Sequence, residues 1–236
     1  MIDIKSEYPS IHNEFMAGLN KCRGRYLFFP LIIFLVLFLF TPSHRCEAED
    51  WQPIEKNYGE NKPGAAKILV AYATRAGSTA EIADAIGKKL AEGGARVDVM
   101  PVGKVQSIGG YSAVVLGSAI RMGNTLPEMN DFADNHKDEL REIPVAYFAV
   151  CMILRENTPK NQEKAYAYIK PLTEVVMPVD TAVFAGKMDY SRLTFFEKLV
   201  IKYIVRVPEG DLRDWQLINN WAAGLLPKLT NRKKEE

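Results

Sequence analysis

Residues 67–86 have the sequence KILVAYATRAGSTAEIADAI, and this stretch decides the fold. The apolar run from Ile68 to Ala73 predicts a strand that is buried on both faces. Apolar residues then recur at helical spacing from Ile82 to Leu90, so the strand leads through the small polar residues 74–79 into a helix. The amide groups and the positive end of such a helix favour a phosphate at the turn. An ordinary helix cap also explains the hydroxyls there.

The composition limits the class of protein. The 236 residues are 47% hydrophobic and 25% charged, which is typical of a globular chain with one domain or one domain plus an appendage. A net charge of +1 argues against a general nucleic-acid-binding protein, which needs a basic surface. The three cysteines and three histidines lack the spacing of metal ligands, so we predict no metal site.

The first 48 residues resemble a secretory signal. Basic residues end the polar segment 1–25, and residues 26–40 are apolar apart from Pro30. A helix over that apolar run spans roughly 22 Å, which is short of a hydrocarbon core of about 30 Å. The small residue Ala48 fits a cleavage site, and an uncleaved anchor with its N-terminus in the cytoplasm is the alternative. Both predict a membrane-associated or exported protein with its domain outside the cytoplasm, joined by a linker over 49–66.

Strands and helices alternate through the rest of the chain. Strands are expected over 68–73, 96–100, 111–118, 144–150 and 180–185. Helices are expected up to Glu92 and over 126–140, 159–175 and 214–226. This alternation predicts an α/β fold with a doubly wound five-stranded parallel sheet over 67–229, followed by a tail at 230–236. Ligands of such sheets bind at the carboxyl ends of the strands.

Three loops leave those carboxyl ends, over 74–79, 117–125 and 151–158. The first offers hydroxyls and a glycine that lets the backbone approach a ligand, and the small residues of the second admit a flat ligand. Apolar walls are expected from Ile120, Met122, Met152 and Ile153. A phosphate turn beside two such loops predicts the flavin mononucleotide FMN. The missing Gly-x-Gly-x-x-Gly pattern argues against a dinucleotide.

Four segments carry a resemblance to a known family. They are TRAGST at 74–79, GSAIRMG at 117–123, AYFAV at 146–150 and FAGKMDY at 184–190. With them, residues 67–229 resemble the flavodoxin-like FMN proteins, and within these most of all the menaquinone-dependent protoporphyrinogen IX dehydrogenases. The resemblance implies an FMN-dependent, quinone-linked dehydrogenase of porphyrin biosynthesis that works at a membrane, with porphyrinogen and quinone as small-molecule partners.

The resemblance also implies which residues bind FMN. Its phosphate would be held by Thr74, Arg75, Gly77, Ser78 and Thr79. Its isoalloxazine ring would be lined by Ser118, Ala119, Ile120, Arg121, Met122 and Gly123, with Cys151, Met152, Ile153 and Leu154 on the other side. The flavin would carry the chemistry, so no catalytic side chain is identified. Arg121 is the one candidate. It would stabilise an anionic reduced flavin or bind a carboxylate of the substrate, and the alternative is an arginine on the surface with neither role.

Two further side chains leave alternatives open. Arg75 contacts either the phosphate or solvent. Cys151 is either a small apolar residue at the end of a strand or a redox thiol, which requires a lowered pKa and exposure.

An insertion over 187–213 carries apolar and basic residues at helical spacing. It is predicted to form a helix that contacts a membrane surface or guides an acidic substrate, which we call the lip of the site. The alternative is a helix that packs on the sheet and leaves its basic edge in solvent. The residues of this lip are Phe195, Phe196, Lys198, Lys202 and Arg206. The alternative function is a flavodoxin-type electron carrier that docks on a redox protein and has no substrate of its own. A third is a scaffold that has lost FMN.

Overall fold

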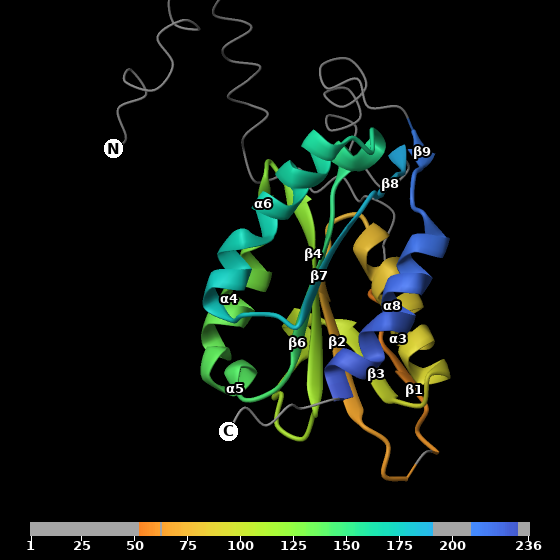
Figure 1. The fold of residues 1–236 in the computed structure, drawn as a ribbon, viewed down its shortest axis with the longest axis vertical. Helices are drawn as coiled ribbons and strands as arrows, with labels where there is room; N and C mark the ends of the chain where they lie inside the picture. The colour runs from red at the N-terminus through yellow and green to blue at the C-terminus, as the bar shows by residue number, and fades with distance from the viewer. Residues whose placement is uncertain (1–51, 62, 191–208, 231–236) are drawn as a thin grey trace, which may run out of the picture. The chain divides into compact units, whose positions relative to one another are not determined.

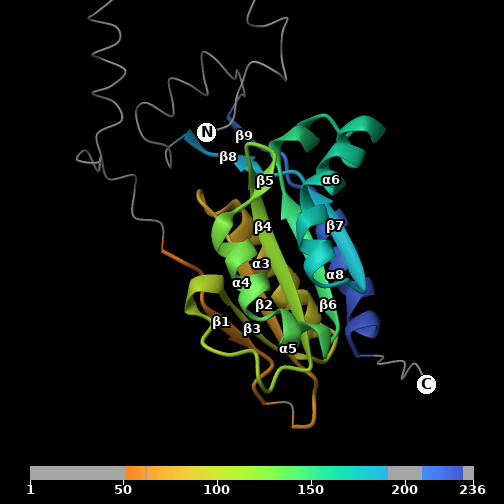
Figure 2. The same cartoon turned by 90° about the vertical axis from the view of Figure 1, so that its left-hand side faces the viewer.

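The computed structural model describes residues 52–61, 63–190 and 209–230 (Figure 1). Its sheet has the strand order β1-β3-β2-β4-β6-β7, which Figure 2 shows side by side. The strands are β1 (Lys56–Tyr58), β2 (Lys67–Ala73), β3 (Arg96–Pro101), β4 (Ala113–Arg121), β6 (Val145–Val150) and β7 (Asp180–Phe184). All neighbours from β3 to β7 pair in parallel, which confirms the predicted α/β fold with a mostly parallel sheet.

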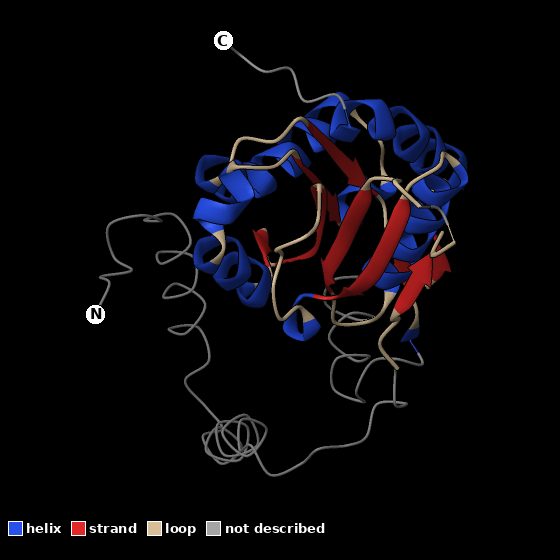
Figure 3. Ribbon diagram, turned by 90° about the horizontal axis from the view of Figure 1, so that it is seen from below, coloured by secondary structure: helices blue, strands red, loops and turns tan. Residues whose placement is uncertain are grey.

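Helices cover both faces of the sheet (Figures 1 and 3). One face packs against α3 (Ser78–Glu92) and α8 (Trp215–Thr230), and the other against α4 (Pro127–Asn135), α5 (Lys137–Arg141) and α6 (Pro159–Val175). Strand β2 serves both cores, because alternate side chains of a strand point to opposite faces. Ile68 and Val70 belong to the first core, and Leu69 and Ala71 to the second. This explains why the strand is apolar without interruption.

The predicted linker over 49–66 contains an unpredicted strand. Strand β1 pairs antiparallel with β3, with Tyr58 opposite Val97. The chain before β1 is held by Tyr72, whose hydroxyl accepts from the Ile54 amide at 2.8 Å and donates to the Ile54 carbonyl at 3.0 Å. The strand is only three residues long and largely exposed, so its sequence carries no apolar period that indicates it.

The predicted loop over 117–125 is largely a strand and a hairpin. Strand β4 continues to Arg121 and pairs antiparallel with the two-residue strand β5 (Asn124–Thr125). Met122 and Gly123 form the turn with φ angles of 52° and 82°, as two-residue hairpin turns require. The predicted helix over 126–140 is likewise two helices, because His136 leaves the helical conformation with φ −108° and ψ 15°.

Several predicted segments lie outside the described residues, namely 1–48, the lip residues 195–206 and the tail after residue 230. Among the helices that the structure does describe, none is long and apolar enough to cross a membrane. The described ends of the insertion form a two-stranded antiparallel sheet of β8 (Lys187–Met188) and β9 (Gly210–Asp211).

Candidate functional site

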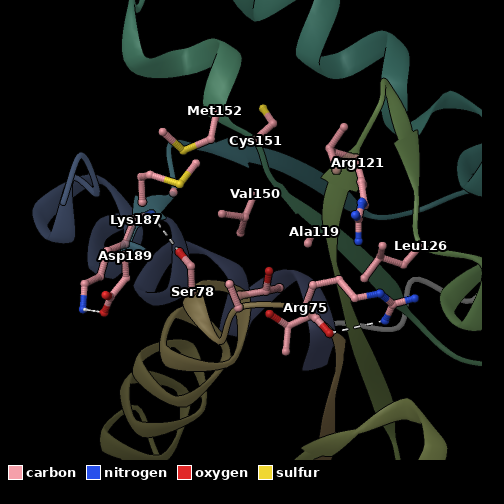
Figure 4. A pocket seen from close by; sticks show the side chains of 16 residues that line it. Arg75, Ser78, Ala119, Arg121, Leu126, Val150, Cys151, Met152, Lys187 and Asp189 are labelled. Carbon is pink, nitrogen blue, oxygen red and sulfur yellow. Dashed lines mark hydrogen bonds and ion pairs between the residues drawn. The ribbon is translucent and has the colours of Figure 1, made fainter. Parts of the chain in front are cut away.

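A cavity of about 220 Å³ opens at the carboxyl ends of β2, β4 and β6 (Figure 4). Four segments that are distant in the chain line it. They contribute Thr74, Arg75, Ala76, Ser78 and Thr79, then Ala119, Ile120, Arg121 and Leu126, then Val150, Cys151 and Met152, and last Gly186, Lys187, Met188 and Asp189. The cavity therefore lies where a doubly wound sheet binds its ligand.

The turn after β2 forms the polar end of the cavity. Gly77 precedes α3 with a φ angle of 85°, a conformation that glycine adopts without strain. The Thr74 hydroxyl accepts from the Gly77 amide at 3.1 Å, and the Glu81 amide donates to the Gly77 carbonyl at 3.1 Å to begin the helix. The first amides of α3 have no acceptor within the helix. They are therefore available to an anion at this end of the cavity.

Thr79 supplies a buried hydroxyl that lacks a partner. The residue is 1% exposed, and its Oγ1 atom makes no hydrogen bond with any described residue. An unsatisfied buried hydroxyl costs roughly 1–3 kcal/mol. A ligand oxygen at the start of α3 would satisfy it, and so the residues present fit a bound phosphate.

Arg75 lies on the cavity rim and pairs with Glu128 in the first turn of α4. Two guanidinium nitrogens bind the two carboxylate oxygens, with Nη2 and Oε2 2.8 Å apart. This hydrogen bond lowers the pKa of Glu128 below its usual value. Neither predicted alternative, phosphate or solvent, named this partner, because Glu128 is 53 residues away in the sequence.

Away from that turn, the wall of the cavity is mostly apolar. Leu126, Val150 and Met152 line it, and Figure 4 shows Val150 and Met152 above Ser78 and Leu126 beside Arg75. Cys151 is 4% exposed, and burial raises the pKa of its thiol to about 11. The thiol is thus protonated at neutral pH, which agrees with a small apolar residue at the end of a strand and not with a redox thiol. A site that is polar at one end and apolar at the other suits a phosphorylated aromatic ligand.

Comparison with known proteins gives the family. Residues 69–214 match the family model of the flavodoxin domain. The chain belongs to the flavodoxin-domain family. Among solved structures, the chain is similar to the flavoprotein in complex with FMN from Lactobacillus acidophilus NCFM. That structure is 13% identical, with a TM-score of 0.38, and the match covers 51% of this chain and 93% of that one.

Curated relatives of this flavodoxin domain carry the name protoporphyrinogen IX dehydrogenase (quinone). The protein from Escherichia coli strain K12 is 28% identical over 167 residues, which are 66% of this chain and 92% of that protein. The protein from Leishmania major is 31% identical over 164 residues, which are 66% of this chain and 71% of that protein.

Part of the predicted FMN-binding set lines the cavity of the flavodoxin domain. The structure brings together Thr74, Arg75, Ser78, Thr79, Ala119, Ile120, Arg121, Cys151 and Met152. It places Gly77, Ser118, Met122, Gly123, Ile153 and Leu154 outside the lining. The Ser118 hydroxyl is taken up by the protein itself, because it accepts from the Leu126 amide at 3.0 Å and donates to the Ala119 carbonyl at 2.9 Å. Met122 is 94% exposed at the hairpin tip.

The segment from Gly186 to Asp189 lines the cavity but was not predicted as part of the site. The Lys187 amide donates to the Ser78 hydroxyl at 3.0 Å, which joins the start of the insertion to the phosphate turn. The motif FAGKMDY, which contains this segment, was the signal available in the sequence. Its position beside TRAGST could not be predicted from the chain, because β4 and β6 separate β7 from β2 in the sheet and the contact is made by the loop that follows β7.

Cys151 of the flavodoxin domain is expected to resist alkylation in the folded protein. Its thiol is buried with a pKa of about 11, so very little reactive thiolate forms at about pH 8. Native protein treated with iodoacetamide and analysed by peptide mass spectrometry should retain an unmodified Cys151. The same treatment in denaturant should modify it. Rapid modification of Cys151 in the native sample would show that the thiol is accessible and reactive.

Proposed function

We propose that this chain is an FMN-binding oxidoreductase of the protoporphyrinogen dehydrogenase type, which passes electrons from a porphyrinogen through FMN to a quinone. The observation that carries the proposal is the buried, unpartnered Thr79 hydroxyl at the start of α3, in a cavity whose far end is apolar. A phosphate is the group that this arrangement of donors favours, and an aromatic ring suits the apolar end.

The residues of the chain would bind and orient the cofactor. The first amides of α3, together with the Ser78 and Thr79 hydroxyls, would donate to the phosphate. Leu126, Val150 and Met152 would contact the ring and exclude water from one side of it. FMN would supply the two-electron redox chemistry that side chains lack.

The proposed substrate and acceptor rest on the relatives. Proteins named for the oxidation of protoporphyrinogen IX with a quinone share 28–31% of their aligned residues with this chain. Arg121 at the end of β4 lies on the cavity rim, where a guanidinium would bind a carboxylate of such a substrate. Its second proposed role is to stabilise the negative charge of a reduced flavin.

The proposal places the domain at a membrane, outside the cytoplasm. It rests on the basic and apolar character of residues 1–48 and on the basic, aromatic residues 195–206 of the insertion. Cell fractionation and the mass of the mature N-terminus test it. A soluble cytoplasmic protein with its original N-terminus would contradict it.

The full chain, purified and freed of ligand, tests the function. FMN titration should give saturable binding, and the loaded protein should oxidise protoporphyrinogen anaerobically with stoichiometric reduction of menadione. Removal of residues 191–208 should abolish turnover while leaving FMN bound, since the proposed lip lies there. Flavin binding with reduction by a redox protein and no porphyrinogen turnover would favour the electron carrier. Failure to bind FMN would contradict both functions.

A further inference from the structure

Arg213 is a buried arginine that pairs with two carboxylates, one of which lies in the first turn of α3. Its side chain is 4% exposed and lies between β9 and the start of α8. Nη1 is 2.6 Å from Oε2 of Glu81, while Nη2 and Nε are 2.6 and 2.8 Å from the carboxylate oxygens of Asp211. The guanidinium also stacks over the Trp215 ring, with 4.4 Å between its carbon and the ring centroid.

These contacts hold one arginine between two carboxylates. Burial by itself lowers the pKa of Arg213, but the hydrogen bonds to Asp211 and Glu81 outweigh it, and the net pKa is raised. The Asp211 pKa is lowered, chiefly by its hydrogen bond from Arg213. Breaking a buried pair of this kind leaves an uncompensated charge.

Glu81 lies in the first turn of α3, at the helix end that faces the cavity. A carboxylate in this turn interacts favourably with the helix dipole but repels a phosphate bound to the same amides. The ion pair with Arg213 offsets the charge of Glu81. The polar end of the cavity therefore keeps its positive character despite an acidic residue beside it.

Asp211 connects the same arginine to the cavity wall. Asp211 of β9 lies opposite Lys187 of β8 in the two-stranded sheet. Lys187 lines the cavity, and its backbone amide donates to the Ser78 hydroxyl. The Leu212 amide donates to the Gly186 carbonyl at 3.2 Å. Arg213 thus joins the first turn of α3 to both described ends of the insertion.

We propose that Arg213 is a positioning residue for the phosphate site, which neutralises Glu81 in the first turn of α3 and fastens the ends of the insertion to that turn. The inference rests on the proposed binding of FMN. It adds a residue that contacts neither the phosphate nor the ring, and that lies 132 residues from Glu81 in the sequence.

FMN and riboflavin distinguish this role from a purely structural one, because they differ only in the phosphate. In the full chain, Arg213→Gln should weaken FMN binding by about tenfold or more and change riboflavin binding less than about twofold. Adding Glu81→Gln to that variant should recover part of the FMN affinity, because it removes the carboxylate from the first turn of α3, although Asp211 still lacks its arginine. Arg213→Lys should retain part of it.

Two further variants complete the test. Glu81→Gln alone should bind FMN as tightly as the wild type or more tightly, with unchanged riboflavin binding, and it keeps the pair of Arg213 with Asp211. Arg141→Gln is the control for the loss of one positive charge, because Arg141 is largely exposed, pairs with Asp138 in α5 and donates to the Val175 carbonyl. It should change neither affinity.

Each result supports or overturns the inference. A parallel loss of FMN and riboflavin binding with no recovery in the double variant would make Arg213 a structural residue only. If Arg213→Gln fails to fold, weaker FMN binding by Glu81→Gln alone would overturn the charge argument. A wild type that binds riboflavin but shows no preference for FMN would end the proposed function and this inference together. If the wild type binds FMN and the Arg213 and Glu81 variants bind it with the same affinity, the inference about Arg213 is wrong while the proposed function stands.

Discussion

Thr79→Val is expected to weaken FMN binding by about 10- to 100-fold while leaving the ligand-free protein equally stable or more stable. Valine has nearly the shape of threonine and replaces the hydroxyl with a methyl group. That hydroxyl has no described partner in the protein, so its removal eliminates an unsatisfied buried group. A hydrogen bond to a charged ligand contributes roughly 1.5–3 kcal/mol, which corresponds to the expected loss of affinity.

Thermal unfolding of the ligand-free protein and titration with FMN measure the two effects. Thr125→Val is the matched control, because Thr125 is also buried but its hydroxyl donates to Asn130 Oδ1 at 2.6 Å. That variant should be destabilised by about 1–2 kcal/mol with little change in FMN affinity. If Thr79→Val were destabilised like the control and bound FMN normally, the Thr79 hydroxyl would belong to the fold and not to the site.

Gly117→Ala is expected to be strongly destabilising. A Cβ atom at Gly117 would lie 2.0 Å from Cζ of Phe148, whose side chain is 1% exposed in the core. Gly117 and Phe148 are paired residues of the central strands β4 and β6, so neither backbone moves easily. Overpacking of this kind costs about 1–3 kcal/mol and occasionally more. The small residues over 117–125 were expected to admit a flat ligand, and in the structure the missing side chain of Gly117 makes room for the Phe148 ring.

Urea unfolding with and without a second substitution tests the cause. Phe148→Leu should destabilise the wild type but cost less in the Gly117→Ala background, because the smaller side chain relieves the clash. Gly224→Ala is the control, since among the described residues no atom beyond the neighbouring residues and backbone of helix α8 lies within 4 Å of the added carbon. It should stabilise the protein by about 0.5–1 kcal/mol. Strictly additive effects of the first two substitutions would contradict the clash.

The confirmed part of the sequence analysis depends on local patterns. The apolar runs predicted the parallel strands β2, β3, β4, β6 and β7, and the helix expected over 159–175 is α6 with the same bounds. This helix begins with a cap, because the Thr158 hydroxyl accepts from the Asn161 amide at 3.2 Å. The differences also have local causes, because the short polar strand β1 lacks a period, and the small residues after Gly117 are compatible with either a loop or a strand.

The sequence by itself therefore determined which segments form the five parallel strands and where the turn that favours a phosphate lies, because neighbouring residues encode both. Only the tertiary structure decided which side chains meet around that turn. Glu128 pairs with Arg75, the Lys187 amide with Ser78, and Arg213 with Glu81, at sequence separations of 53, 109 and 132 residues. Such pairs depend on strand order and helix packing, and no local pattern of residue types specifies these.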